Sequence, residues 1–192
     1  MFGAITEAVS RRRALLIAPF ALGGAAVVLS QVGRSSGGGE NIDVTIVEFD
    51  DAGRKLGAAG REKVVRSDGG WRRQLPPAQY WSARRGSTDT PFTGTYYHLE
   101  TAGLFRCGCC GNALFNSSTK FDSGTGWPSF NSPVAAENIF TLTDNSLALE
   151  RVEVLCRLCD AHLGHVFDDG PPPTGLRYCI NESALRFVAS SS

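Results

Sequence analysis

The sequence has no net charge, because its 19 lysines and arginines balance 19 aspartates and glutamates over 192 residues. A basic excess or a basic stripe is the usual electrostatic sign of a protein that binds nucleic acid or an anionic surface. We therefore expect no nucleic-acid partner. The sequence also has no internal repeat of fixed period.

Helical periodicity is scarce as well. Turn-forming residues are frequent instead, with 22 glycines and nine prolines. From Pro91 onward, short strand-like stretches alternate with turns rich in glycine, asparagine, aspartate and proline. A composition of 42% apolar and 20% charged residues is typical of soluble globular proteins. The sequence therefore predicts a globular body that is mainly β.

The amino terminus has an apolar run that is short and broken by glycine and by Pro19, so it is a poor permanent membrane span. The basic trio Arg11–Arg13 precedes this run, which is the arrangement of an export signal and resembles a twin-arginine signal. We predict that residues 1–31 are such a signal or an uncleaved N-terminal anchor. Either interpretation places the protein in the periplasm or on the outer face of the cytoplasmic membrane.

Three further segments follow. Residues 32–40 are rich in glycine and serine and read as a linker. Residues 41–66 begin with alternating apolar side chains and an Asp-Ala-Gly turn, which predicts a small β extension. Residues 67–188 form the main domain. Ser67 is a candidate N-cap for a short helix, and the proline pair after it either stops that helix or begins a second one through Tyr80.

Four cysteines form two C-x-x-C motifs, Cys107 with Cys110 and Cys156 with Cys159. Each motif points two sulfurs at one centre, so the pair can supply four thiolates to one tetrahedral structural Zn²⁺. Two disulfides, or a thioredoxin-like redox pair, are the alternatives. Cys109 lies inside the first motif, and its spacing leaves it outside the zinc set.

Two of the three histidines in the chain, His162 and His165, directly follow the second motif. A histidine here can replace a cysteine at the metal, pack in the core, or act as a general acid near neutral pH. Trp127 stands on a Gly-Trp-Pro turn, where it is either a core residue or displayed to hold a methyl or sulfur group of a ligand.

The segment GLRYCINESALRF, residues 175–187, contains a cysteine in a strand-like pattern. With a period of two, one face carries Leu176, Tyr178 and Ile180 and the other carries Arg177, Cys179 and Asn181. The thiolate is the reactive form of cysteine, and a nearby cation favours it. We therefore expect Arg177 to lower the pKa of Cys179.

Three segments together resemble the B-type methionine-R-sulfoxide reductases. They are PFTGTYYHLETAGLFRCGCCGNALFNSSTKFDSGTGWPSF, CRLCDAHLGHVFDDG and GLRYCINESALRF. The resemblance covers residues 67–188 and includes several motifs in the same order. It implies the β-tent fold, which is mainly β with two antiparallel sheets, short N-terminal helices and one structural zinc.

The resemblance also implies roles for individual residues. Cys179 matches the nucleophile; His162, His165 and Asn181 match the residues that bind and protonate the sulfoxide oxygen; Trp127 matches the pocket wall; Arg177 and Asp169 match polar residues that tune the site. The implied reaction is thiol-dependent reduction of methionine sulfoxide, free or in peptides and proteins, through a sulfenic acid on Cys179. It repairs oxidised proteins and requires a thioredoxin-like or other thiol reductant. We expect a monomer.

One position departs from much of the family, because Thr125 stands where many members carry a resolving cysteine. Either Cys109 resolves the sulfenic acid or an external thiol reduces it directly. Two functions of other classes remain possible from the sequence. One is a zinc-stabilised β-domain that binds oxidised or thioether peptides without turnover, and the other is a purely structural zinc-ribbon-like domain. Neither needs a thiol between Arg177 and Asn181.

Overall fold

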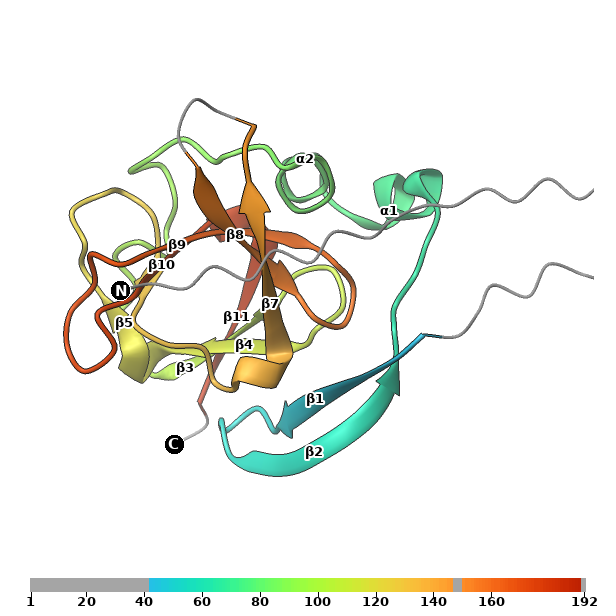
Figure 1. Ribbon diagram of the computed structural model, residues 1–192, viewed down its shortest axis with the longest axis horizontal. Coiled ribbons are helices and arrows are strands. Elements are labelled where there is room, and N and C mark those ends of the chain that lie inside the picture. Colours follow the sequence, from blue (N-terminus) through green and yellow to red (C-terminus); the bar gives the residue numbers. More distant parts are fainter. Residues whose placement is uncertain (1–41, 147–149, 191–192) are drawn as a thin grey trace, which may run out of the picture. The chain divides into compact units, whose positions relative to one another are not determined.

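The structure is a computed structural model that describes residues 42–146 and 150–190 (Figure 1). The predicted export signal and linker lie outside the described residues. In the described part of the chain, no helix is long and apolar enough to span a membrane.

A sheet of six antiparallel strands forms the larger part of the domain, in the order β5-β6-β10-β9-β8-β7. Its strands are β5 (Lys120–Phe121), β6 (Ser129–Phe130), β7 (Ile139–Asp144), β8 (Arg151–Cys156), β9 (His162–Phe167) and β10 (Arg177–Ile180). The strand β10, which carries the predicted nucleophile, lies between β6 and β9 near the middle of this sheet. A thiol in this position has a strand on each side.

A second sheet has three antiparallel strands in the order β11-β3-β4. These strands are β3 (Gly103–Cys107), β4 (Ala113–Asn116) and β11 (Leu185–Ala189), and three short 3₁₀ turns accompany the sheets at η1 (Ser117–Thr119), η2 (Ala136–Asn138) and η3 (Glu182–Ala184). Aromatic rings join the two sheets: Phe130 of β6 stacks on Phe115 at 4.5 Å and meets Phe105 edge-on at 5.0 Å between ring centroids. All three side chains are fully buried.

Two short helices precede the sheets, α1 (Asp68–Gln74) and α2 (Pro77–Arg85). The Ser67 side chain caps α1 by accepting a hydrogen bond from the Gly70 N–H. Pro77 begins α2, which runs past Tyr80 and ends at Gly86 in the left-handed region with φ of 68°. The prediction of a mainly β fold with two antiparallel sheets and short N-terminal helices is confirmed.

A separate hairpin of β1 (Asp43–Phe49) and β2 (Lys55–Glu62) lies against β4 and η2 (Figure 1). Asn138 of η2 fastens it, because its side chain accepts a hydrogen bond from the Val47 N–H at 2.7 Å and donates to the Val47 carbonyl at 2.8 Å. The same amide donates to the Ala113 carbonyl at 2.8 Å. Asn138 therefore joins the hairpin to the strand that follows the first cysteine motif.

Candidate active site

The register of the six-stranded sheet places Cys179 in a row of facing residues. Cys179 lies opposite His165 of β9 on one side and opposite Ser129 of β6 on the other. His165 in turn lies opposite Glu153 of β8. Residues directly opposite each other in antiparallel strands point to the same face of the sheet. The thiol, the imidazole and the carboxylate therefore share one face.

A small cavity of about 120 Å³ opens on this face. Its wall includes Cys179, His165, Asn181, Trp127, Arg151 and Phe167. Four of the residues predicted for the site thus come together around one cavity. His162, Arg177 and Asp169 were also predicted for the site, but they are not among the described residues that line the cavity. Any effect of these three on a bound substrate passes through the residues that do line it.

Burial dominates the ionisation of Cys179. It raises the pKa of the thiol, while the hydrogen bond from Thr125 and the charge of Arg177 lower the pKa by less. The prediction that Arg177 lowers the pKa of Cys179 agrees with the direction of its effect, but burial outweighs that effect. The depth at which β10 is buried could not be predicted from the local pattern of residues 175–187.

Arg177 is held by Asp169 through two hydrogen bonds of 2.8 Å, from Nε and from one terminal nitrogen. The guanidinium also lies over the Phe167 ring at 4.4 Å from its centroid. The Asp169 carboxylate raises the pKa of Arg177, and Arg177 lowers that of Asp169. Arg177 is only 9% exposed, so this pair holds a buried cation whose charge acts on Cys179.

His165 is oriented by a carboxylate that the sequence did not reveal. Its Nε2 lies 2.8 Å from Asp144 at the end of β7, and Arg151 contacts the same carboxylate oxygen at 2.6 Å. Hydrogen bonds from Ser146, and then from His165, hold the pKa of Asp144 well below its usual range. An ionised carboxylate only accepts hydrogen bonds, so the neutral imidazole carries its proton on Nε2. Nδ1 is then the nitrogen that can take up or give a proton.

Burial lowers the pKa of His165, and the Asp144 hydrogen bond offsets part of that effect. His162 has a similar carboxylate partner, because its Nδ1 lies 2.6 Å from Glu153. The rings of His162 and His165 meet edge-on at 5.5 Å between centroids. His162 is buried, and its Nε2 has no hydrogen-bond partner among the described residues.

The backbone of Asp89 positions two residues of the cavity wall. Its N–H donates to the Asn181 side-chain oxygen at 2.9 Å, and its carbonyl accepts a hydrogen bond from Trp127 Nε1 at 2.9 Å. Because the oxygen of the Asn181 amide is occupied, its NH₂ group is the part available to a ligand. Trp127 is partly exposed and lines the cavity, so it is displayed and not a core residue.

A chain of hydroxyl groups approaches the thiol from the other side. Thr125 Oγ1 lies 4.0 Å from Cys179 Sγ, and Ser123 Oγ lies 2.8 Å from Thr125 Oγ1 and 2.7 Å from Ser129 Oγ. Thr125 is thus the side chain at which a second thiol could most directly meet Cys179.

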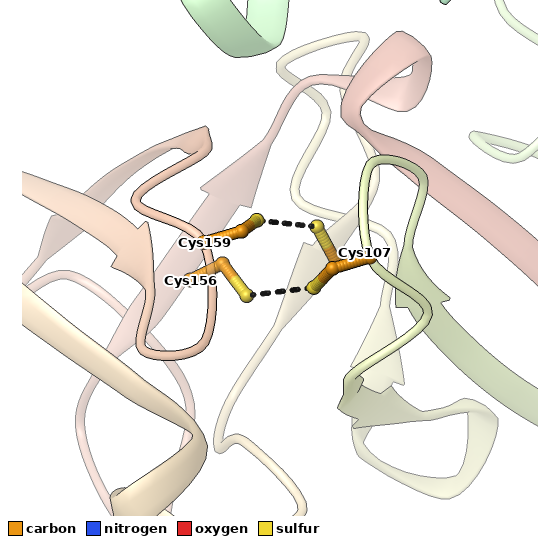
Figure 2. Close-up of side chains that lie close together, drawn as sticks. Cys107, Cys156 and Cys159 are labelled. Carbon is orange, nitrogen blue, oxygen red and sulfur yellow. Dashed lines mark hydrogen bonds between the residues drawn. The ribbon is translucent and has the colours of Figure 1, made fainter. Parts of the chain in front are cut away.

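The four motif cysteines form a separate cluster whose sulfurs all lie within 4.8 Å of one another. Figure 2 shows Cys107, at the end of β3, facing Cys156 at the end of β8 and Cys159 on the loop that follows. The Cys107–Cys159 sulfurs are 3.7 Å apart and the Cys110–Cys156 sulfurs 3.6 Å. Four ligands at the usual Zn–S distance of about 2.3 Å are separated by about 3.8 Å in a tetrahedron.

These distances fit a four-thiolate metal site and are far too long for disulfides, whose sulfurs are about 2.05 Å apart. The neighbouring thiols of Cys109 and Cys110 lower the pKa of Cys107, which favours the thiolate that a metal needs. Four cysteines complete the set, so no histidine is needed as a ligand. Cys109 is 5% exposed, belongs to the surrounding apolar cluster, and does not line the Cys179 cavity.

Sequence reasoning missed Asp144, Arg151, Glu153 and Asp89. A signal was present for two of them, because Arg151 and Glu153 alternate with Val152 and Val154 and so share one face of a strand. No feature of the nearby sequence indicated that this face of the strand lies next to His162 and His165.

Comparison with known proteins shows clear relatives. A sequence model of the SelR domain matches residues 75–189. A peptide methionine sulfoxide reductase MsrB of Hahella chejuensis is 54% identical over 126 residues, which is 66% of this chain and 91% of that protein. MsrB of Pseudomonas aeruginosa strain UCBPP-PA14 is 52% identical over 122 residues, or 64% of this chain and 92% of that protein. The chloroplastic reductase B1 of Arabidopsis thaliana is 51% identical over 124 residues, or 64% of this chain and 61% of that protein.

Proposed function

The chain belongs to the SelR-domain family of peptide methionine sulfoxide reductases, and we propose that it reduces the R epimer of methionine sulfoxide through a sulfenic acid on Cys179. The observation that carries this proposal is the row of Cys179 and His165 beneath a cavity that Trp127 and Asn181 enclose. Repair of oxidised proteins is the role that we assign to this activity.

Cys179 is the nucleophile of the proposed reaction. Its sulfur attacks the sulfoxide sulfur, and the Asn181 NH₂ group, together with His165, holds the sulfoxide oxygen. In the net step, one oxygen atom passes to Cys179, two electrons pass to the substrate sulfur, and methionine leaves. Trp127 offers an apolar wall to the S-methyl group.

His165 supplies the proton route. Burial keeps Cys179 as a thiol and His165 as a neutral imidazole near pH 7. We propose that Nδ1 of His165 takes the proton of Cys179 and delivers it to the sulfoxide oxygen. Asp144 fixes the tautomer, and the Arg177 guanidinium, fixed by Asp169, stabilises the thiolate as it forms.

Regeneration requires two external thiols in this proposal. The first attacks the Cys179 sulfenic acid and forms a mixed disulfide with release of water, and the second releases the Cys179 thiol as the external disulfide forms. Thr125 has no thiol, and Cys109 is buried beside the metal-site cysteines, so neither favours an internal disulfide. A thioredoxin-like protein or a small thiol fits this requirement.

Cys107, Cys110, Cys156 and Cys159 would hold one Zn²⁺. The zinc would have a structural role, because its four cysteine ligands are none of the residues that line the cavity. It would tie the β3–β4 loop to the β8–β9 loop and so stabilise the domain. We also propose that residues 1–31 direct export or anchor the chain at the membrane, on the basis of their basic trio and apolar run.

The test uses purified protein with excess dithiothreitol and peptides that carry either epimer of methionine sulfoxide, with methionine followed by mass. The proposal predicts that the R epimer alone is reduced and that Cys179→Ser abolishes the reaction. Reduction of the S epimer, or activity in Cys179→Ser, would overturn it. Failure to reduce either epimer in folded, zinc-loaded protein would favour a domain that binds oxidised peptides without turnover.

A further inference from the structure

A second, larger cavity of about 450 Å³ lies beside the catalytic one. The two cavities share Thr88 and Trp127 in their walls. The larger one is bounded by α2, by the segment before and after Asp89, by the Gly126–Pro128 turn and by η3. A polypeptide whose oxidised side chain enters the small cavity can therefore continue across Trp127 into the larger one.

An exposed aromatic ring forms one side of this larger cavity. Trp81 of α2 is 52% exposed, although tryptophan normally buries most of its large apolar surface. Tyr80 packs against it edge-on at 5.6 Å between ring centroids, which holds the ring in place. An indole face in a wall of this kind can hold a cation or an aliphatic stem.

The charge of the larger cavity has a single sign. Asp89 and Glu182 line it, and none of its described lining residues is lysine or arginine. The Asp89 carboxylate accepts hydrogen bonds from the N–H and hydroxyl of Ser183. Glu182 accepts them from Thr95 and from the Tyr96 N–H. In the described part of the chain, neither carboxylate forms an ion pair, so both charges act on whatever occupies the cavity.

We propose that this larger cavity binds a residue that flanks the oxidised methionine in a polypeptide substrate, and that it prefers a lysine or arginine there. The cation would lie between the Trp81 ring and the carboxylates of Asp89 and Glu182. The inference rests on the proposed function and narrows its substrate from methionine sulfoxide in general to oxidised polypeptides with a basic neighbour.

The test compares three substrates with the full chain and dithiothreitol. They are N-acetyl-methionine-R-sulfoxide amide, a pentapeptide with lysine on both sides of the oxidised methionine, and the same peptide with glutamate at both positions. We expect kcat/KM for the lysine peptide to exceed that for the glutamate peptide by about tenfold at low salt. This ratio should shrink toward one at about 1 M salt, where the Debye length is about 3 Å.

Two variants test whether the preference for the lysine peptide arises in the larger cavity. Asp89→Asn removes a charge, and its amide can still accept from the Ser183 N–H and donate to the Ser183 hydroxyl. Trp81→Ala removes the exposed ring. Each should reduce the lysine-to-glutamate ratio about threefold. Leu56→Ala, which changes an exposed side chain on β2, is the control and should keep the ratio of the unaltered protein.

The results separate this inference from the function on which it rests. If the blocked single residue is not reduced, the proposed function fails. If the blocked residue is reduced but the two peptides have equal kcat/KM at low salt, the cation preference is overturned while the function stands. A ratio that survives both Asp89→Asn and Trp81→Ala would overturn the assignment to this cavity.

Discussion

At the scale of single residues, Cys179 and His165 are the two groups of the proposed proton transfer, and both are neutral before it begins. Burial opposes the thiolate of Cys179 and the imidazolium of His165 alike. Arg177 counters the first effect and Asp144 the second. A thiol and an imidazole in facing register can exchange one proton with no change in the net charge of the buried face.

This arrangement predicts the pH dependence of the reduction step. Protonation of His165 removes the proton acceptor, and burial lowers its pKa, so the acid limb should fall below the ordinary value of 6.5. Loss of the Cys179 proton removes the one that is passed to the substrate, and this pKa is raised, so the alkaline limb should lie above 9.0. Single-turnover rates of methionine formation against pH measure both limbs.

The Arg177→Gln variant should move the alkaline limb to higher pH, because the guanidinium lowers the pKa of Cys179. Arg186→Gln is the matched control, since Arg186 is an exposed arginine on β11. An alkaline limb that stays in place in Arg177→Gln would contradict the electrostatic role of this residue.

Thr125 provides a second prediction at this scale. Its Oγ1 is 4.0 Å from the Cys179 sulfur, so a modest movement would bring a sulfur at this position to the disulfide distance of about 2.05 Å. We expect Thr125→Cys to form an internal disulfide with Cys179 after one turnover, seen by peptide mass. Thr125→Ser keeps the hydroxyl and should form none. Thr125→Cys protein that retains only an unlinked sulfenic acid would show that the two positions do not meet.

At the scale of elements, the sequence predicted which residues share a strand face but not which strands are neighbours. The period of two in GLRYCINESALRF correctly separated Cys179 from the core side chain Ile180. The carboxylate partners of His162 and His165 were not predictable, because they come from β8 and β7 through a strand order set by the whole sheet. The burial that raises the pKa of Cys179 was not predictable for the same reason, since it depends on packing between distant segments.

The hairpin β1–β2 yields a prediction about packing. Asn138 is fully buried, and its side chain makes three hydrogen bonds to the backbone of Val47 and Ala113. Asn138→Ala leaves those groups unpaired and should cost about 2–4 kcal/mol in the free energy of unfolding. Denaturant unfolding measures this loss, and limited proteolysis should cut the hairpin first. Asn145→Ala, at an exposed asparagine, is the control. Equal stability of the two variants would mean that Asn138 does not hold the hairpin.

At the scale of the whole molecule, the cysteine cluster joins loops from both sheets, so zinc should govern the stability of the entire domain. Chelation should lower the midpoint of thermal unfolding by more than about 10 °C, and added Zn²⁺ should restore it. Two buried cysteines of the first motif region, Cys107 at the end of β3 and Cys109 on the following loop, give a matched pair. Cys107→Ser should lose the metal, and Cys109→Ala should retain one zinc and its activity with dithiothreitol. Loss of zinc from Cys109→Ala would contradict the assigned ligand set.

The central claim is that Cys179 takes the oxygen of the substrate. Met1 is the only methionine of the chain. A mass increase of one oxygen atom on the peptide that contains Cys179 therefore cannot come from an oxidised methionine of the enzyme. The most direct measurement mixes the enzyme with excess methionine-R-sulfoxide peptide and dimedone, without reductant. The account predicts about one methionine formed per enzyme molecule and a dimedone adduct on the Cys179 peptide. Formation of methionine with no adduct on Cys179, or an adduct on another cysteine, would contradict it.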